Sequence, residues 1–165
     1  MKTIKKTLPI LLLLAITSVI SSCSSDDGST ETENQSEYYM TAKVNGQEYS
    51  ANQDAIVTNF TGIVDGTDIR GVYQIDIDNY EHIRFDLIEY DNSLGTFDLT
   101  SGNNSMTYQI NSKAWAAHNT IGSGSVTITV NDTTHIEGTF SGTLIDVTDD
   151  TTKVITEGNF SAIKQ

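Results

Sequence analysis

Two aspartates next to apolar residues are the first candidates for chemistry in this chain. Asp76 and Asp78 alternate with Ile75 and Ile77, so a strand would place both carboxylates on one face, with Cα atoms roughly 6.5–7 Å apart. Carboxylate pairs at such separations hydrolyse glycosides. A glycosidase also needs a cleft that desolvates one acid, and regular alternation with apolar residues is more typical of a solvated strand face.

The same two acids offer the oxygen ligands that Ca²⁺ prefers. Further oxygen donors are Asn79, Asp91, Asp149 and Asp150. No stretch has the spacing of a calcium loop, so the sequence predicts no cofactor and leaves a structural calcium at Asp76 and Asp78 open.

Aromatic residues are the candidates for ligand binding. Trp115 is the only tryptophan, in a segment of small residues, and Tyr80 and Tyr90 lie near expected strand ends. Sugars stack on exposed rings of this kind, so the three could line a binding surface. The alternative is that they fill the core or cap its ends.

Motifs of common enzyme classes are absent from the sequence. There is no Gly-x-Ser-x-Gly elbow, no phosphate loop and no His-Glu-x-x-His. His82, His118 and His135 are dispersed without the spacing of metal ligands. The sequence therefore favours a protein that is not an enzyme.

Alternation with a period of two runs through residues 38–165 and predicts strands throughout. About nine or ten strands are expected, which is typical of an antiparallel β-sandwich or a calycin-like β-barrel. Residues 73–78 and 83–87 should pair as a hairpin, with Arg84 facing Asp76. Asn45-Gly46 and Asp65-Gly66 read as two-residue hairpin turns, and Ser112 to His118 as a strand end and loop.

A Glu-Gly-x-Phe pattern occurs at residues 137–140 and again at 157–160, with a partial copy at 95–97. Glycine inside a strand often marks a bend or the close approach of a neighbour. We expect these strands to curve, with a neighbouring aromatic ring packed over the missing side chain.

The N-terminal segment reads as an export signal. Lys2, Lys5 and Lys6 precede an apolar run from residue 8 to 20, which is shorter than the roughly 20 residues that span a bilayer. The run ends in Ile20-Ser21-Ser22-Cys23, which resembles the lipobox of bacterial lipoproteins. The resemblance implies that Cys23 is diacylated and becomes the new N-terminus, and two acyl chains anchor a protein stably.

The chain then divides into a signal peptide (1–22), the acylated cysteine with an acidic tether (23–37) and one all-β domain (38–165). Residues 24–37 have no apolar side chain and five acids, so we expect disorder. Ser25-Asp26-Asp27 resembles the signal that sends Bacteroidota lipoproteins to the cell surface. The alternative is a spacer that faces the periplasm.

Charge excludes one class of partner. Removal of residues 1–22 takes away three lysines and no acid, which leaves 6 basic against 22 acidic side chains and a formal charge of −16. Nucleic-acid binders need a basic surface, so nucleic acid is not an expected partner. With Cys23 acylated the domain has no thiol for a disulfide.

Several short motifs carry a second resemblance. Val44-Asn45-Gly46, Gly95-Thr96-Phe97, Gly124-Ser125-Val126 and the two Glu-Gly-x-Phe segments are similar to those of a family of small, functionally uncharacterised Bacteroidota lipoproteins. The resemblance implies the β fold and the outer-membrane location but no site. We expect a non-catalytic domain, anchored through Cys23, that binds a glycan, a small ligand or a partner protein. A hydrolase using Asp76 and Asp78 and a purely structural envelope protein are the alternatives.

Overall fold

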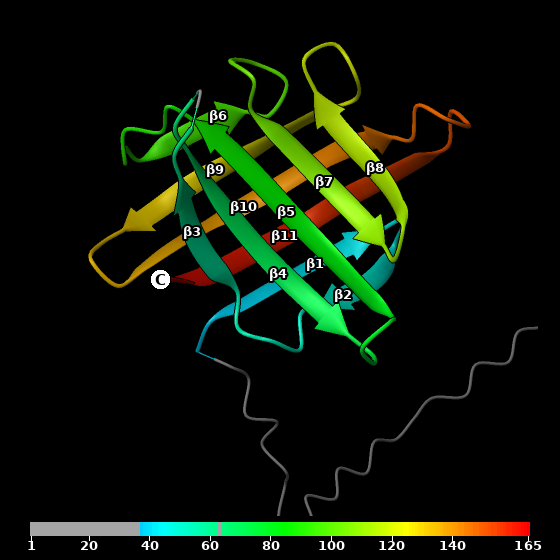
Figure 1. Ribbon diagram of the computed structural model, residues 1–165, viewed down its shortest axis with the longest axis horizontal. Coiled ribbons are helices and arrows are strands. Elements are labelled where there is room, and N and C mark those ends of the chain that lie inside the picture. Colours follow the sequence, from blue (N-terminus) through cyan, green and yellow to red (C-terminus); the bar gives the residue numbers. More distant parts are fainter. Residues whose placement is uncertain (1–36, 63) are drawn as a thin grey trace, which may run out of the picture. The chain divides into compact units, whose positions relative to one another are not determined.

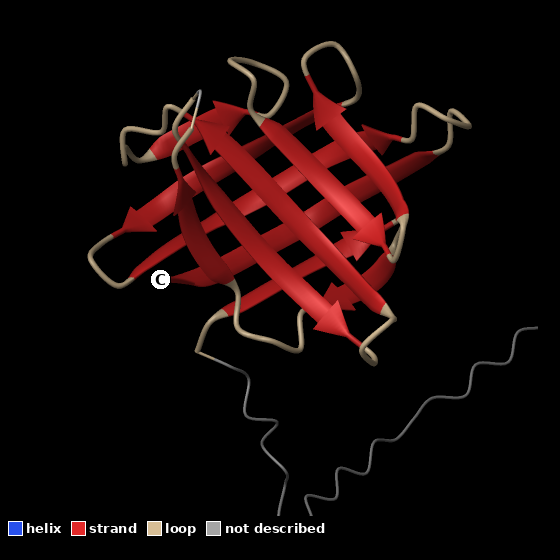
Figure 2. Ribbon diagram, viewed as in Figure 1, coloured by secondary structure: helices blue, strands red, loops and turns tan. Residues whose placement is uncertain are grey.

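The computed structural model describes residues 37–62 and 64–165. In this part of the chain all regular structure is β-strand, and Figure 2 shows the strands joined by loops. The strands are β1 (Tyr39–Val44), β2 (Gln47–Ser50), β3 (Ile56–Phe60), β4 (Gly66–Gln74), β5 (Tyr80–Ile88), β6 (Gly95–Asp98), β7 (Ser105–Ile110), β8 (Lys113–His118), β9 (Ser123–Asn131), β10 (His135–Ile145) and β11 (Thr152–Lys164). The all-β class is confirmed, with eleven strands where about nine or ten were expected.

Hydrogen bonding joins these strands into one sheet that closes on itself. Their order is β2-β1-β11-β3-β4-β5-β7-β8-β10-β9-β6, and a further pairing of β10 with β11 closes a ring of seven. In Figure 1, β4, β5, β7 and β8 lie in front of β9, β10, β11 and β1 and cross them. The fold is therefore barrel-like, with two crossed layers joined at both edges.

The two edges close through short contacts. At one edge β11 pairs with β3 through Ile163 and Lys164, and this pairing is parallel whereas all other strand pairs of the described residues are antiparallel. At the other edge β8 meets β10 at one bridge, between Ala116 and Ile145. The long strands β10 and β11 hold the layers together because each takes part in the ring and in the rear layer.

Alternation fills the space between the layers with apolar side chains. On β5, Ile83, Phe85 and Leu87 are fully buried and the residues between them are not. Successive side chains of a strand point to opposite faces, so such a pattern directs one face inward. The largest fully buried side chains are Phe85, Phe160, Met40, Ile69, Ile83, Leu87, Leu99, Met106, Ile128, Ile136, Leu144 and Ile155.

The repeated Glu-Gly-x-Phe pattern forms a reciprocal contact between β10 and β11. Gly138 lies opposite Phe160, and Gly158 lies opposite Phe140. A Cβ atom at Gly138 would lie 2.9 Å from the Phe160 ring, and one at Gly158 would lie 2.5 Å from the Phe140 ring. The pairing shifts by one residue after Phe140, which marks a bulge and bends the strands. The expected curvature and aromatic cover are confirmed for these two segments. At the partial copy the expected cover is wrong, because a Cβ atom at Gly95 would meet no other atom within 4 Å.

The hairpin of β4 and β5 forms as expected, but in a different register. The strand β4 ends at Gln74, so residues 75–79 form the turn. Arg84 lies opposite Arg70 and pairs with Asp68 and Asp86. The expected contact of Arg84 with Asp76 is therefore wrong.

Two of the expected turns have different outcomes. Asn45 and Gly46 join β1 to β2 with φ angles of 50° and 79°, which confirms a two-residue turn with positive φ. Asp65-Gly66 is not such a turn, because Gly66 pairs with Phe60 inside the sheet and the connection comprises residues 61–65. The reason for Gly66 is packing, since the Phe60 ring lies over it.

The segment from Ser112 to His118 is a strand rather than a strand end and loop. Residues 113–118 form β8, which pairs with β7 along its whole length. The alanines of this segment have a low preference for strands, and that is why the sequence did not predict one. The pairing with β7 outweighs this local preference.

The described residues fall in a single compact unit. The predicted signal peptide, Cys23 and the tether up to residue 36 lie outside them. Within the described part of the chain, no helix has the length and apolar character needed to cross a membrane.

Candidate functional site

Asp76 and Asp78 lie in a turn, so the premise that they share a strand face is wrong. Asp76 Oδ1 accepts hydrogen bonds from the backbone N–H groups of Asp78 and Asn79, at 2.9 Å each. The Asn79 side chain and these N–H groups lower the pKa of Asp76. Ile75 and Ile77 are 69% and 88% exposed, so they alternate with the acids without any buried face. The Asp76 carboxylate shapes the turn.

Trp115 is buried, with 6% of its surface exposed. Its Nε1–H donates to Thr151 Oγ1 at 2.9 Å, and its ring packs against Tyr108. The ammonium groups of Lys113 and Lys153 lie 5.0 and 4.8 Å from the ring centroid. This arrangement matches the alternative of a core aromatic and leaves no open ring for a sugar.

Tyr80 and Tyr90 do not share a surface with each other. Tyr80 is the first residue of β5 and Tyr90 lies two residues beyond the last one, so the whole strand, about 25–30 Å long at the usual rise per residue, lies between them. Tyr80 stacks on His82 with ring centroids 5.7 Å apart, and Tyr90 packs edge-on against Phe97 at 5.3 Å. The predicted aromatic binding surface is therefore not assembled.

Metal-binding geometry is equally weak in the described residues. No three His, Cys, Asp or Glu side chains there come together as a group that could hold a metal ion. The histidines lie in separate strands, on β5, β8 and β10. Calcium at Asp76 and Asp78 stays a prediction.

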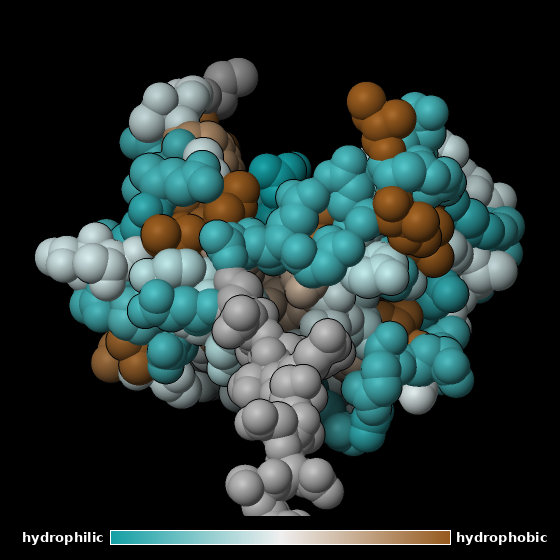
Figure 3. All heavy atoms as spheres, turned by 90° about the horizontal axis from the view of Figure 1, so that it is seen from below, coloured by the Kyte–Doolittle hydropathy of each residue, from teal (hydrophilic) through white to brown (hydrophobic). Residues whose placement is uncertain are grey.

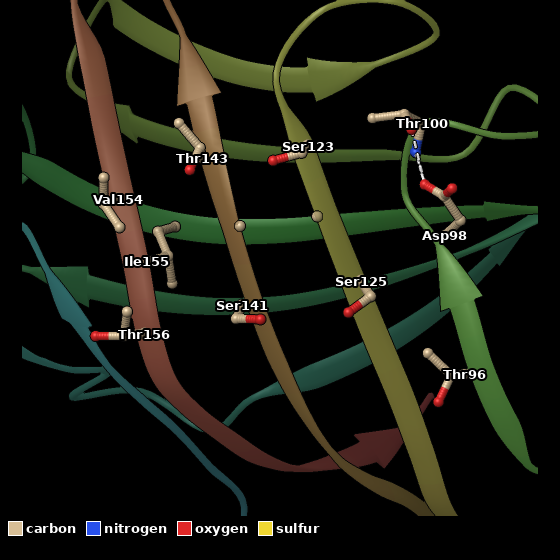
Figure 4. Close-up of a pocket in the computed structure, with 12 residues that line it drawn as sticks. Thr96, Asp98, Thr100, Ser123, Ser125, Ser141, Thr143, Val154, Ile155 and Thr156 are labelled. Carbon is tan, nitrogen blue, oxygen red and sulfur yellow. Dashed lines mark hydrogen bonds between the residues drawn. The ribbon is translucent and has the colours of Figure 1, made fainter.

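A different site emerges on the outer face of the rear layer, which we call the hydroxyl groove. It crosses β6, β9, β10 and β11 and has a volume of about 650 Å³. Seven of its twelve lining residues are serine or threonine: Thr96, Thr100, Ser123, Ser125, Ser141, Thr143 and Thr156. The others are Asp98, Gly124, Gly142, Val154 and Ile155. Figure 4 shows these side chains side by side across the four strands.

Strand register brings these hydroxyl groups into rows. Ser125 pairs with Ser141 on one side and Asp98 on the other, and Ser123 pairs with Thr143. Directly opposite side chains have Cβ atoms about 4.5–5.5 Å apart. The rows face outward because they alternate with residues of the core, as Ser125 does with the buried Val126.

Most of these hydroxyl groups are available to a ligand. Within the described residues, those of Ser123, Ser125, Ser141, Thr143 and Thr156 make no hydrogen bond to the protein. Each hydroxyl can donate one hydrogen bond and accept others. The groove therefore offers a set of unpaired donors and acceptors at fixed spacing.

Asp98 is the one charged residue that lines the groove. Its Oδ1 accepts hydrogen bonds from the Thr100 backbone N–H at 2.8 Å and from Thr100 Oγ1 at 2.7 Å. These bonds lower the pKa of Asp98, so the carboxylate is ionised at neutral pH. No arginine, lysine or histidine lines the groove, and an anionic ligand would be repelled.

Sequence reasoning missed this groove. The signal was the threonine-rich outer face beside Val126 and Ile128, which is also what any solvated strand face shows. The groove forms only when β6 pairs with β9 and β10 with β11, and 27 or more residues separate Asp98 from Ser125 and Ser125 from Thr156.

Apolar surface is scattered over the described residues. The most exposed large apolar side chains are in separate loops: Ile75 and Ile77 in the β4–β5 turn, Leu94 before β6 and Val147 after β10. Figure 3 shows apolar residues as separate groups among polar ones on the face seen from below. This distribution gives little support to an apolar ligand.

Comparison of the chain with protein-family models, with curated proteins and with solved structures finds no match. The resemblance to lipoproteins stays a prediction.

Proposed function

We propose that this protein is a lipid-anchored, non-catalytic binding protein that holds a neutral glycan in the hydroxyl groove. The observation that carries the proposal is the array of unpaired hydroxyl groups beside one ionised carboxylate. A volume of about 650 Å³ lies within the roughly 300–1,000 Å³ of small-molecule sites.

The chemistry of the groove suits sugars. A sugar ring presents hydroxyl groups that donate and accept, and Ser125 and Ser141 can do both in return. Asp98 can accept hydrogen bonds from two neighbouring sugar hydroxyls, and bonds to a charged acceptor are stronger than neutral ones. Without a stacking ring, affinity rests on several such bonds, so we expect weak binding that gains from a repeating chain.

The anchor is the second part of the proposal. The lipobox-like residues end at Cys23, and the domain that follows carries strong negative charge. Such charge disfavours electrostatic attachment to anionic lipid, so acyl chains on Cys23 would hold the protein at the outer membrane. The Ser25-Asp26-Asp27 segment of the tether, which resembles a surface-export signal, would then direct the domain to the cell surface.

A filled-groove variant tests ligand binding. Ser141 is exposed at the centre of the groove, and Ser141→Tyr adds bulk without touching the core. Thr58→Tyr is the matched control, because Thr58 is an exposed hydroxyl on β3, which pairs along its whole length with β4 of the front layer. Affinity electrophoresis against neutral and anionic polysaccharides should show retardation by a neutral one. We expect Ser141→Tyr to weaken it at least tenfold, about 1.4 kcal/mol, and Thr58→Tyr to leave it unchanged.

Two results would count against this function. Retardation only by anionic polysaccharides would contradict the charge argument. Equal retardation of the wild type and Ser141→Tyr would place the ligand outside the groove.

Anchoring has its own test. Replacement of Cys23 with alanine should leave an uncleaved precursor or release the domain, as seen by mass and by membrane fractionation. A Cys23→Ala protein of mature mass that stays in the membrane would contradict the anchor. Protease added to intact cells separates surface exposure from a periplasmic location, because a periplasmic domain would be protected.

A further inference from the structure

The only two arginines of the chain lie next to each other on the outer face of the front layer. Arg70 on β4 pairs directly with Arg84 on β5. Like charges in directly opposite positions destabilise a pair of strands. In a domain with few basic residues, this placement needs an explanation.

The two arginines differ in their partners. Arg84 Nε lies 2.8 Å from Asp68 Oδ2, and Arg84 Nη2 lies 2.7 Å from Asp86 Oδ1. Arg70 makes no hydrogen bond or ion pair within the described residues. Its Nε is the one buried side-chain nitrogen or oxygen there that lacks a partner. An unpaired buried N–H of this kind is costly and often marks the place of a water or an ion.

The residues around Arg70 explain why no side chain of the protein accepts a hydrogen bond from its guanidinium group. The nearest acid on the same strand face is Asp68, two residues away, and Arg84 already binds that carboxylate. The strand neighbours opposite Arg70 are Ile56 on β3 and Arg84 on β5. Neither of these can accept a hydrogen bond through its side chain.

His82 is a further polar side chain on the same face of β5 as Arg84. It is two residues from Arg84 on the same face, and Tyr80 stacks on its ring. Burial lowers the pKa of His82, and the two arginines lower it further. The imidazole is therefore neutral at pH 7 and can donate one hydrogen bond. Arg70 and Arg84 are the charged side chains whose electrostatic effect on His82 is resolved, and both disfavour its protonated form.

We propose that Arg70 and His82 form a binding site for the carboxylate group of a small organic acid or an acidic sugar. A guanidinium presents two parallel N–H groups that match the two oxygens of a carboxylate. Because the Nε atom itself is buried, a carboxylate would contact Arg70 through the two terminal Nη groups, and its charge would offset the repulsion between the arginines. This site lies on the opposite layer from the hydroxyl groove and does not depend on it.

The charge of the whole chain sets how strong this binding can be. Asp68 and Asp86 lie nearby, and the net charge of −13 repels anions. At physiological salt that repulsion is screened beyond about 8 Å, whereas contact with Arg70 is within hydrogen-bond distance. We expect affinity in the millimolar range, with specificity for a planar acid.

The small number of arginines gives a direct test. The full chain, labelled with ¹⁵N and kept in detergent, has two arginine Nε–H signals in its NMR spectrum. Sodium glucuronate is added, with glucose and sodium chloride of equal ionic strength as controls. We expect a saturable shift of the Arg70 signal with glucuronate, a smaller shift of the Arg84 signal, and none with glucose or chloride.

Variants of the basic residues test whether the glucuronate-dependent shifts arise from binding at Arg70. Arg70→Gln should abolish the glucuronate-dependent shift of the His82 ring signals, and Arg70→Lys should weaken binding at least fivefold because it keeps the charge and loses the fork. Lys43→Gln, which removes a half-buried cation of β1 that already pairs with Glu157, should change nothing. Equal responses to glucuronate and chloride, no response of Arg70, or a His82 response that survives Arg70→Gln would each overturn the proposal.

Discussion

Replacement of Gly158 with alanine probes the contact that joins β10 and β11. A Cβ at position 158 would lie 2.5 Å from Cδ2 and 2.6 Å from Cγ of Phe140, where carbon atoms normally stay about 3.5–4.0 Å apart. Phe140 has little room to withdraw. It is buried and packs edge-on against Phe85, with ring centroids 4.7 Å apart.

The size of the effect follows from this geometry. Overpacking a core costs about 1–3 kcal/mol. The Phe140 carbonyl oxygen would also lie 2.5 Å from the new methyl group, and backbone cannot rotate away as a side chain can. We therefore expect a loss of about 3 kcal/mol of unfolding free energy, the top of that range. For a domain of this length that corresponds to a Tm lower by roughly 10 °C.

Urea denaturation followed through the fluorescence of Trp115, the only tryptophan, measures this loss. Gly62→Ala is the control, because its nearest heavy atom would be 4.0 Å away, and we expect no loss there. Removal of the ring by Phe140→Ala should reduce the cost of alanine at 158 in a double-mutant cycle. A loss for Gly158→Ala of less than about 0.5 kcal/mol, the usual size of a neutral surface change, would refute the packing argument.

Three further predictions concern polar contacts. Arg84→Gln should destabilise the protein more at about pH 7 than at about pH 4, as measured by urea denaturation, because burial already raises the pKa of Asp68 and an unpaired carboxylate is costly only when ionised. Hydrogen bonds from Lys113 and Thr151 lower the pKa of Asp149 to about 2, below the unfolded value of about 3.9. The stability that Asp149 contributes is therefore present above the unfolded pKa and is lost as the pH falls through about 2. Asp149→Asn should make the unfolding free energy fall less steeply as the pH is lowered through this range. Trp115→Phe removes the hydrogen bond to Thr151 and should cost about 1 kcal/mol in thermal unfolding followed by circular dichroism.

Local patterns in the sequence were enough to predict most of the strands, the Asn45-Gly46 turn and the packing of rings over Gly138 and Gly158. Each depends on residues close in the chain, because alternation and turn geometry are local properties. Gly138 and Gly158 were informative since a glycine inside a strand has few explanations. The closure of the ring, by contrast, depends on contacts between β3 and β11, at opposite ends of the domain.

The candidate site shows where local reasoning ends. The alternation at Asp76 and Asp78 looked like a strand face, but Asp76 binds its neighbours' backbone N–H groups and makes a turn. Trp115 seemed to lie in a loop, and pairing of β8 with β7 turns it into the core. The hydroxyl groove and the arginine pair both require cross-strand register, which alternation alone does not give.

The measurement that tests the proposed function most directly is an NMR titration of the full chain with the neutral oligosaccharide that binds best. If the hydroxyl groove is the site, backbone amide signals of Ser125, Ser141 and Asp98 should shift together and saturate at one affinity. Saturable shifts confined to the face of β4 and β5, or an absence of any shift with neutral oligosaccharides, would contradict the account.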